Sequence, residues 1–343
     1  MLIYGRNATG KTNLGKAFMD ISMLMSGRTR FISDEVFLNA DSIEETAAFS
    51  YTFQFEGREV IYNYSRISNQ ELRKEQLVIE GTEIFKCDFF SGEYEFTNLE
   101  YIEAETANIE RYLQSFEVSE ETEEVIETKL PFLRWLVSNV ALKSDSVLLQ
   151  LMDYVRRMSM LTVGSALLHF PRRMNDSFYE LLENSERLRD LEEFLNVMGI
   201  ECRLVLKKLP DGQRELYFAH EKLIPFFANA SSGTLALVTL YRRLVSRVRE
   251  SSLLYLDEFD AFYHYEMAEK LVRFFKNKYP KCQIIMTSHN TNLMTNRLMR
   301  PDCLFILSRM GTLTSLCNAT PRELREGHNL EKMYISGEFE SYE

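Results

Sequence analysis

Residues 5–12 read Gly-Arg-Asn-Ala-Thr-Gly-Lys-Thr, and this octapeptide decides the fold. It follows a short apolar stretch, residues 1–4, and precedes residues 13–25, where apolar side chains recur at helical spacing. A strand, a loop of the pattern G-x-x-x-x-G-K-[ST] and a helix together make a phosphate-binding loop. The glycines let the backbone surround a phosphate closely, and the helix N-terminus adds N–H donors. The sequence therefore predicts an α/β fold of the P-loop NTPase type.

The positions of this loop predict separate roles in binding a nucleotide. We expect Lys11 to reach the β- and γ-phosphates and the Thr12 hydroxyl to be a ligand of Mg²⁺. The remaining predicted binding positions surround these two residues in the same loop: Gly5, Asn7, Ala8, Thr9, Gly10 and Asn13.

Two later apolar segments end in polar residues that suit the other half of such a site. Residues 253–258 read Leu-Leu-Tyr-Leu-Asp-Glu, which places Asp257 at the carboxyl end of a strand, where parallel sheets hold ligands such as Mg²⁺. Glu258 is a candidate general base for an attacking water. Residues 283–290 form a second buried strand that runs into Ser-His-Asn and includes His289. Each pattern alone also fits an ordinary strand end, but their order along the chain favours the nucleotide site.

Small polar residues and a glycine open a further helix within residues 229–244, NASSGTLALVTLYRRL. This pattern fits an ordinary N-capped helix, and it equally fits a second phosphate-binding helix N-terminus. One nucleotide needs two such helices only if the second helix comes from a partner subunit.

The rest of the chain divides into an α/β beginning, a long middle insertion and an α/β end. Alternation over residues 48–65 predicts an antiparallel hairpin, extended by residues 76–79 and 83–87. The insertion is acidic over 101–128, and its periodicity predicts helices that include one over 176–198. A second hairpin is expected at 200–219, followed by strands alternating with helices, one of them between residues 288 and 304. We predict an N-terminal lobe (1–94), a helical insertion (95–200) and a C-terminal lobe (201–343).

Composition limits the class of protein further. With 40 Lys and Arg against 51 Asp and Glu, the formal charge of −11 excludes a surface devoted wholly to nucleic acid, although not a local basic patch. The apolar runs are too short to span a membrane. The five scattered cysteines contain no C-x-x-C pair and predict a reducing, cytoplasmic location.

Four segments in this order resemble the ABC-type ATPase heads of the SMC, RecF and OLD group: GRNATGKT, ASSGT, LLYLDEFD and TSHN. More narrowly, the chain resembles bacterial AAA-type proteins of abortive-infection and phage-defence loci. The segments FSYTFQFEGREVIYNYS, RKEQLVIEG and HNLEKMYISGEF carry that narrower similarity.

The resemblance implies ATP as the nucleotide, Mg²⁺ as the metal and a head-to-tail dimer that encloses two nucleotides. Lys11, Glu258 and His289 would be the catalytic residues, with Thr12 and Asp257 on the metal. Ser231 and Gly233 match the ABC signature, with Thr234 in place of the usual Gln. Asp260 falls in the loop that crosses to the other subunit.

Departures from the group add further expectations. The group's strand before the P-loop strand is missing, which predicts an unpaired sheet edge. Gln54 and Gln70 are the candidates for the group's Q-loop glutamine. The stretch after His289 is too short for the Toprim nuclease of OLD proteins, so we expect a separately encoded effector, a nuclease or toxin.

Two other functions stay open on the sequence. One is a DNA-maintenance ATPase that binds DNA on ATP-driven dimerisation, for which three basic pairs are candidates: Arg156-Arg157, Arg172-Arg173 and Lys207-Lys208. The other is a scaffold that binds nucleotide without hydrolysing it, against which the presence of both Lys11 and Glu258 argues. The long separation of Lys11 from Asp257 disfavours a transporter subunit.

Overall fold

A computed structural model describes residues 1–27, 38, 42–68, 71–104, 106–117, 130–162, 176–247 and 251–343, with the side chains of 246 and 247 left out. The described chain forms two compact units. One comprises Met1–Met19 and Arg157–Glu343, and the other comprises Asp20–Arg156. Each unit is a group of residues that contact one another. The division of the sequence into 1–94, 95–200 and 201–343 is a different one and stays a prediction.

The first unit is built on a six-stranded sheet in the order β14-β13-β1-β12-β11-β7, and all its neighbouring pairs except β13–β14 are parallel. Its central strand, β1 (Leu2–Tyr4), lies between β12 (Gln283–Ser288) and β13 (Leu304–Leu307). The expected unpaired edge is therefore absent at β1, because two later strands pair with it. The predicted P-loop α/β fold is confirmed.

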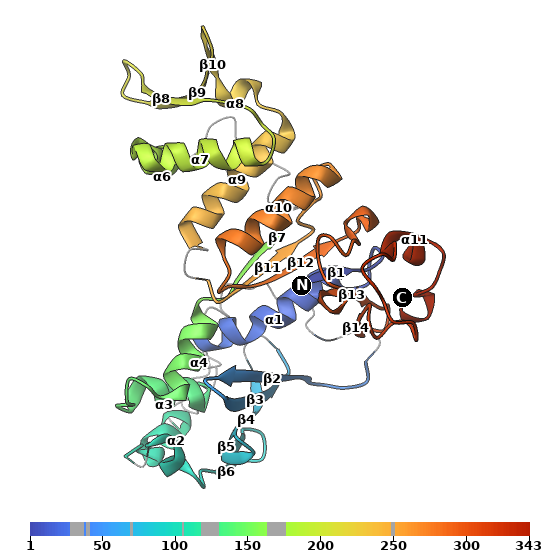
Figure 1. Ribbon diagram of the computed structural model, residues 1–343. Helices are drawn as coiled ribbons and strands as arrows, with labels where there is room; N and C mark the ends of the chain where they lie inside the picture. The colour runs from blue at the N-terminus through green and yellow to red at the C-terminus, as the bar shows by residue number, and fades with distance from the viewer. Residues whose placement is uncertain are drawn as a thin grey trace. The chain divides into compact units, whose positions relative to one another are not determined.

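Helices cover both faces of this sheet, which lies between α1 (Lys11–Ser26) and α10 (Tyr265–Lys278) in Figure 1. Alternation along β11 (Leu253–Asp257) explains the two faces. Leu254 and Leu256 join the core that contains the apolar side of α10. Tyr255 points the other way, and a Cβ placed on Gly15 of α1 would lie 2.6 Å from its ring. The absence of a side chain at Gly15 therefore lets the P-loop helix lie close to β11.

Three sequence expectations for this unit are corrected. The edge strand β7 (Ser159–Thr162) belongs to the parallel sheet, although the sequence placed it in a helical insertion. The single helix expected over 176–198 is two helices, α6 (Asp176–Glu183) and α7 (Ser185–Val197), because Asn184 accepts the Glu186 N–H at 2.9 Å and caps a new helix. Between 288 and 304 the chain makes only 3₁₀ turns, at Thr291–Leu293 and Pro301–Cys303.

The remaining elements of the first unit include a small antiparallel sheet, β10-β9-β8. Its strands are β8 (Leu204–Lys208), β9 (Arg214–Ala219) and β10 (Leu223–Pro225), so the second predicted hairpin is confirmed. The other elements follow in chain order: α8 (Phe226–Asn229), α9 (Ser232–Arg247), β14 (Leu313–Ser315), α11 (Leu330–Ile335) and a 3₁₀ turn at Glu340–Tyr342.

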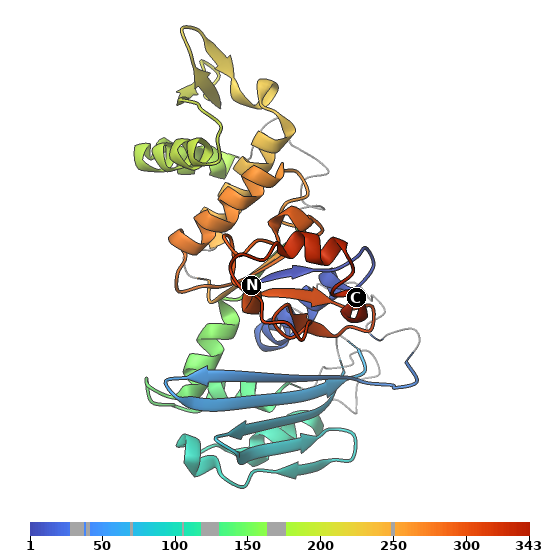
Figure 2. The ribbon, with the colours of Figure 1, turned by 45° about the vertical axis from the view of Figure 1, so that its right-hand side comes forward.

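The second unit contains a five-stranded antiparallel sheet in the order β2-β3-β4-β5-β6, visible as long adjacent strands in Figure 2. The predicted hairpin is β2 (Ala47–Phe55) and β3 (Arg58–Arg66), which pair without a register shift. The sheet continues with β4 (Leu72–Ile79), β5 (Thr82–Asp88) and β6 (Glu93–Glu95). Three helices complete the unit, α2 (Ile109–Glu117), α3 (Phe132–Asn139) and α4 (Val147–Arg156), with a 3₁₀ turn at Leu99–Ile102. Residues 118–129, which include the last part of the acidic run, lie outside the described residues.

Buried polar groups tie the second unit together. Arg66 of β3, which is 2% exposed, pairs with Asp20 on the second half of α1, and the Tyr64 hydroxyl donates to the same carboxylate. Glu75 of β4 is fully buried and accepts the backbone N–H of Phe132 at 2.6 Å and of Leu133 at 3.0 Å. A helix N-terminus has N–H groups without partners inside the helix, so Glu75 fixes the start of α3 on the sheet.

Candidate nucleotide-binding site

The loop between β1 and α1 has the backbone shape of an anion site. Ala8 and Gly10 have positive φ values of 63° and 92°, which turn successive N–H groups toward one point. The Thr9 hydroxyl donates to the Arg6 carbonyl at 3.0 Å and closes the turn. At Gly5 a Cβ would lie 2.6 Å from the Thr9 hydroxyl oxygen, so a larger residue here would displace the hydroxyl that closes the turn. Asn13 lies in the first turn of α1, whose N–H groups have no acceptor inside the helix.

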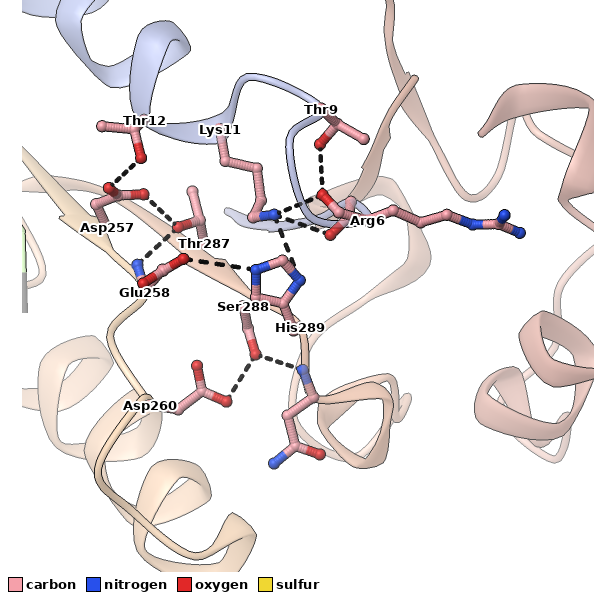
Figure 3. A network of polar contacts seen from close by, with 12 residues as sticks. Arg6, Thr9, Lys11, Thr12, Asp257, Glu258, Asp260, Thr287, Ser288 and His289 are labelled. Carbon is pink, nitrogen blue, oxygen red and sulfur yellow. Dashed lines mark hydrogen bonds and ion pairs between the residues drawn. The ribbon is translucent and has the colours of Figure 1, made fainter. Parts of the chain in front are cut away.

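The Lys11 ammonium group lies inside this loop, as Figure 3 shows. Its Nζ donates to the Gly5 carbonyl at 2.9 Å and the Arg6 carbonyl at 3.0 Å, and lies 3.4 Å from His289 Nδ1. Lys11 is only 5% exposed, and burial lowers its pKa, while Glu258 and Asp257 oppose that shift. Desolvation of the ammonium makes it a stronger partner for a phosphate than it would be in water.

The carboxylate of Asp257 connects the loop to two neighbouring strands. The Thr12 hydroxyl donates to its Oδ2 at 2.7 Å, and the Thr287 hydroxyl donates to its Oδ1 at 2.8 Å. Asp257 and Thr287 are both fully buried. The Thr287 oxygen also accepts the backbone N–H of Glu258 at 2.8 Å, so one hydroxyl holds two acidic positions in place.

Glu258 leaves the strand in an unusual backbone conformation. Its φ is 48°, in the left-handed region that residues with a side chain seldom adopt. The Glu258 N–H bond to Thr287 holds this conformation, as does the Phe259 N–H bond to the Thr287 carbonyl at 3.2 Å. The side chain remains 42% exposed and lies 3.6 Å from His289 Nε2. The turn therefore presents a carboxylate and an imidazole together beside Lys11.

Asp260 belongs to the same network through Ser288, the last residue of β12. The Ser288 hydroxyl donates to Asp260 Oδ2 at 2.7 Å and accepts the backbone N–H of Asn290 at 2.9 Å (Figure 3). Burial is the main cause of the raised pKa of Asp260, and the Ser288 hydrogen bond opposes it. These bonds fix the chain on both sides of His289.

Two residues of the candidate site were not predicted from the sequence, Thr287 and Tyr255. The Tyr255 hydroxyl donates to the Lys11 carbonyl at 2.5 Å and thereby joins β11 to the start of α1. Both residues sit within apolar strand patterns, where their types are ordinary. The only available signal is that Tyr255 lies two residues before Asp257 and Thr287 two residues before His289.

Ser231 and Gly233 form a separate feature at the start of α9. Ser231 caps this helix, since its hydroxyl oxygen accepts the Thr234 N–H at 3.1 Å and lies 2.8 Å from the Thr234 hydroxyl. A Cβ on Gly233 would lie 3.5 Å from the Phe262 carbonyl, in the turn after Asp260. Among the described residues, hydrogen bonds or close contacts connect six of the predicted site residues: Lys11, Thr12, Asp257, Glu258, Asp260 and His289. Ser231 and Gly233 are not part of that network.

The residues present fit a nucleotide with a magnesium ion. Mg²⁺ prefers a few protein oxygens together with phosphate oxygens and waters. The Thr12 hydroxyl and Asp257 carboxylate, 2.7 Å apart beside the loop, supply that donor set. Within the described ranges there is no group of three or more His, Cys, Asp or Glu side chains that could hold a metal by themselves.

The other predicted residues lie elsewhere or outside the described structure. Gln54 lies in β2 of the second unit, opposite Glu59 of β3, and Gln70 is outside the described residues. Lys207 and Lys208 are exposed at the end of β8, opposite Glu215 and Arg214. Residues 172 and 173 are not described. No described helix has the length and apolar character needed to cross a membrane.

The fold and the loop define a P-loop nucleotide-binding protein. Its candidate metal-binding acid, Asp257, ends β11, and its candidate base, Glu258, comes directly after that strand. Residues 1–295 match the family described as "AAA domain, putative AbiEii toxin, Type IV TA system". The chain belongs to this AAA-type ATPase family.

Solved structures that resemble the chain include three SMC heads. The "SMC head domain from Thermotoga maritima" is 14% identical, with a TM-score of 0.42 over 92% of this chain and 89% of that chain. An SMC head bound to the C-winged helix domain of ScpA is 14% identical, with a TM-score of 0.45 over 92% and 90%. A Pyrococcus furiosus SMC head with an extended coiled coil, bound to the C-terminal domain of ScpA, is 13% identical, with a TM-score of 0.45 over 99% and 92%. Comparison with the curated proteins gives no match.

Proposed function

We propose that this chain hydrolyses ATP in the presence of Mg²⁺ and that Glu258 is the general base. The observation that carries the proposal is the placement of the Glu258 carboxylate 3.6 Å from His289, whose other ring nitrogen lies 3.4 Å from the Lys11 amine in the P-loop. A base, a polar ring and a cation thus surround the place where a γ-phosphate on the loop would lie.

Each residue has a defined part in this reaction. Lys11 moves its ammonium from the loop carbonyls to the β- and γ-phosphate oxygens, where it offsets their negative charge. Glu258 takes a proton from the water that attacks the γ-phosphorus, while the bond from phosphorus to the bridging oxygen breaks. His289 donates a hydrogen bond to the γ-phosphate. A Mg²⁺ ion held by the Thr12 hydroxyl and the Asp257 carboxylate would offset further negative charge on the phosphates.

The second part of the proposal is a head-to-tail dimer that encloses two nucleotides. Ser231 and Gly233 of one subunit would contact the γ-phosphate bound to the other subunit, with Asp260 at the crossing loop. The start of α9 supports this role, because a helix N-terminus attracts anions and Gly233 has no side chain to cover the N–H groups there. Since each site would need both subunits, ATP binding would join them and hydrolysis would release them.

The third part concerns the biological role. The family's description names a toxin and a toxin–antitoxin system. We infer that the nucleotide-driven dimer controls a separately encoded nuclease or toxin in anti-phage defence, in the cytoplasm. This inference has its support in the family membership rather than in any one residue.

The test compares the wild type with Glu258→Gln and Lys11→Ala. We expect slow turnover of ATP by the wild type. Glu258→Gln should lose at least about a hundredfold in turnover, the usual contribution of a general base, while it still binds ATP and accumulates as a nucleotide-bound assembly. Lys11→Ala should neither turn over ATP nor respond to it. Mass in solution with and without Mg-ATP, together with phosphate release, measures both effects.

The results separate hydrolysis from dimerisation. Normal turnover by Glu258→Gln would refute the assignment of the base. If Mg-ATP left the mass of Glu258→Gln unchanged, the shared site would be wrong and a scaffold that binds nucleotide within one subunit would be favoured. Ser231→Arg, which places a bulky cation at the start of α9, should abolish the ATP-dependent increase in mass without preventing ATP binding.

A further inference from the structure

The outer edge of the antiparallel sheet in the second unit is formed by β2, Ala47–Phe55. In the part of the chain that the structure describes, no strand pairs with this edge. The strand is nine residues long and runs against β3 without a register shift. It is therefore a long and regular edge strand.

The turn that follows β2 determines which of its backbone groups face outward. Glu56 and Gly57 both have positive φ, 49° and 89°, as a two-residue type I′ turn requires. The residues on either side of such a turn, Phe55 and Arg58, form a hydrogen-bonded pair. Because bonded and non-bonded pairs alternate, the odd-numbered residues of β2 bond to β3. The even-numbered residues direct their N–H and C=O groups outward: Ala48, Ser50, Thr52 and Gln54.

This edge lacks the features that normally protect an edge strand. Proteins discourage pairing between edges with charged residues, prolines, bulges or short strands. The sequence AAFSYTFQF contains no charge and no proline, and its even-numbered side chains are exposed and small or neutral. The odd-numbered side chains are only partly buried, including those of Phe49, Tyr51 and Phe53. A second strand would cover the remaining surface of these aromatic rings.

The sequence of β2 is close to its own mirror about Tyr51. Phe49 and Phe53 are equivalent across that centre, and so are Ser50 and Thr52. In an antiparallel pair of two such strands, Tyr51 would face Tyr51 of the second copy, and Phe49 would face Phe53. Aromatic pairs across strands stabilise a sheet, and no like charges would meet. The outward groups of Ala48 would meet those of Gln54, and the groups of Ser50 those of Thr52, so every outward N–H and C=O would find a partner.

We propose that β2 is an interface with a second copy of this chain, formed by antiparallel pairing of the two strands about Tyr51. The pairing joins two five-stranded sheets into one continuous sheet with a twofold axis. It uses none of the residues of the nucleotide site and needs no nucleotide. With an ATP-dependent contact at the other unit, it would make assemblies larger than a dimer available to the chain.

The first test is the mass of the nucleotide-free protein in solution, in the wild type and in Lys11→Ala. Both should be dimers at micromolar concentration. Thr52→Pro removes an outward N–H and leaves the bonds between β2 and β3 in place, so it should raise the dimer dissociation constant at least tenfold. Thr52→Val, which keeps the N–H and suits a strand, is the matched control and should remain dimeric. Circular dichroism verifies folding, and Thr52→Lys, which brings two like charges together, replaces the proline variant if that variant unfolds.

The second test fixes the register by disulfide formation. Facing residues of a non-hydrogen-bonded pair have Cα atoms about 4.5 Å apart, within the range of a disulfide. Tyr51→Cys should therefore cross-link two copies under mild oxidation. In the proposed register Ser50 faces Thr52, so Ser50→Cys should not cross-link beyond the wild-type background.

Each result decides for or against the interface. A nucleotide-free dimer that Thr52→Pro dissociates and Tyr51→Cys cross-links would support it. A nucleotide-free monomer would overturn it and leave the edge to an extended segment of another protein. A dimer that survives both Thr52→Pro and Thr52→Lys would also overturn it. Cross-linking through Ser50→Cys in place of Tyr51→Cys would overturn the register. The β2 interface predicts that Lys11→Ala is a dimer without nucleotide. The ATP-dependent contact predicts that Mg-ATP does not increase the mass of this variant. The two proposals can therefore fail independently.

Discussion

The hydroxyl of Thr287 accepts the backbone N–H of Glu258 at 2.8 Å, which joins the end of one strand to the end of its neighbour. The same hydroxyl donates to Asp257. A fully buried residue therefore determines where the candidate base, Glu258, and the candidate metal-binding carboxylate, Asp257, lie. This makes Thr287 a positioning residue in the proposed reaction.

Replacing Thr287 with Val should lower kcat for ATP hydrolysis by on the order of a hundredfold, because a shift of about 1 Å in a catalytic group has that effect. The KM for ATP should change little, since Lys11 and the loop are untouched. Steady-state kinetics measures both constants. Thr287→Ser keeps the hydroxyl and should retain most of the activity. An unchanged kcat in Thr287→Val would show that the Glu258 turn holds without this bond.

Gly15→Ala should weaken the contact between the P-loop helix and β11. The added Cβ would lie 2.6 Å from the Tyr255 ring, and overpacking of a core typically costs about 1–3 kcal/mol in the free energy of unfolding. Chemical denaturation measures the loss. Combining Gly15→Ala with Tyr255→Leu removes the clashing ring and should restore part of the stability. If the single variant is as stable as the wild type, the helix can move without cost.

Stability should depend on pH through Glu75, because burial raises the pKa of this carboxyl from 4.5 to about 7. Between these values the folded protein holds a proton that the unfolded chain releases. The free energy of unfolding should therefore fall as pH rises from 4.5 to 7, by about 3 kcal/mol from this group. Glu75→Gln should flatten the dependence, and Glu59→Gln, at an exposed position of the same sheet, should not. Denaturation at several pH values decides, and an equal slope in wild type and Glu75→Gln would contradict the expectation.

The buried pair of Asp20 and Arg66 should be costly to break on one side. Asp20→Asn removes the carboxylate that pairs with the buried Arg66 guanidinium, and breaking one side of a buried ion pair typically costs about 3–5 kcal/mol in the free energy of unfolding. Replacing both residues, with Asp20→Leu and Arg66→Met, should recover much of the loss because neither charge of this pair remains. The exposed pair Arg300–Asp302 provides the control, and Asp302→Asn should have no measurable effect. Equal losses in the single and double variants would show that the ion pair is not the source.

The sequence by itself determined the chemistry of the nucleotide site. The spacing of Gly5, Gly10, Lys11 and Thr12 has a direct physical meaning, since a tight phosphate loop tolerates few residue types. The strand ending at Asp257 was equally readable, because a buried parallel strand is a continuous apolar run and its carboxyl end carries the polar residues. Period-two alternation identified the β2–β3 hairpin for the same kind of local reason.

Only the tertiary structure decided which distant residues meet. No local pattern assigned β7 to the edge of the parallel sheet, because the four residues of β7 pair with a strand that is distant in sequence. Leu161 of β7 pairs with Leu256 of β11, nearly one hundred residues later. The break at Asn184 depends on a cap that the helical periodicity on either side concealed. Thr287, Tyr255 and Glu75 are ordinary residues in strand patterns, and their roles arise from partners far along the chain. A phosphate-binding loop and an apolar period depend on neighbouring residues, so the sequence shows them directly. The pairing of a buried hydroxyl or carboxylate with a distant partner exists only once the chain has folded.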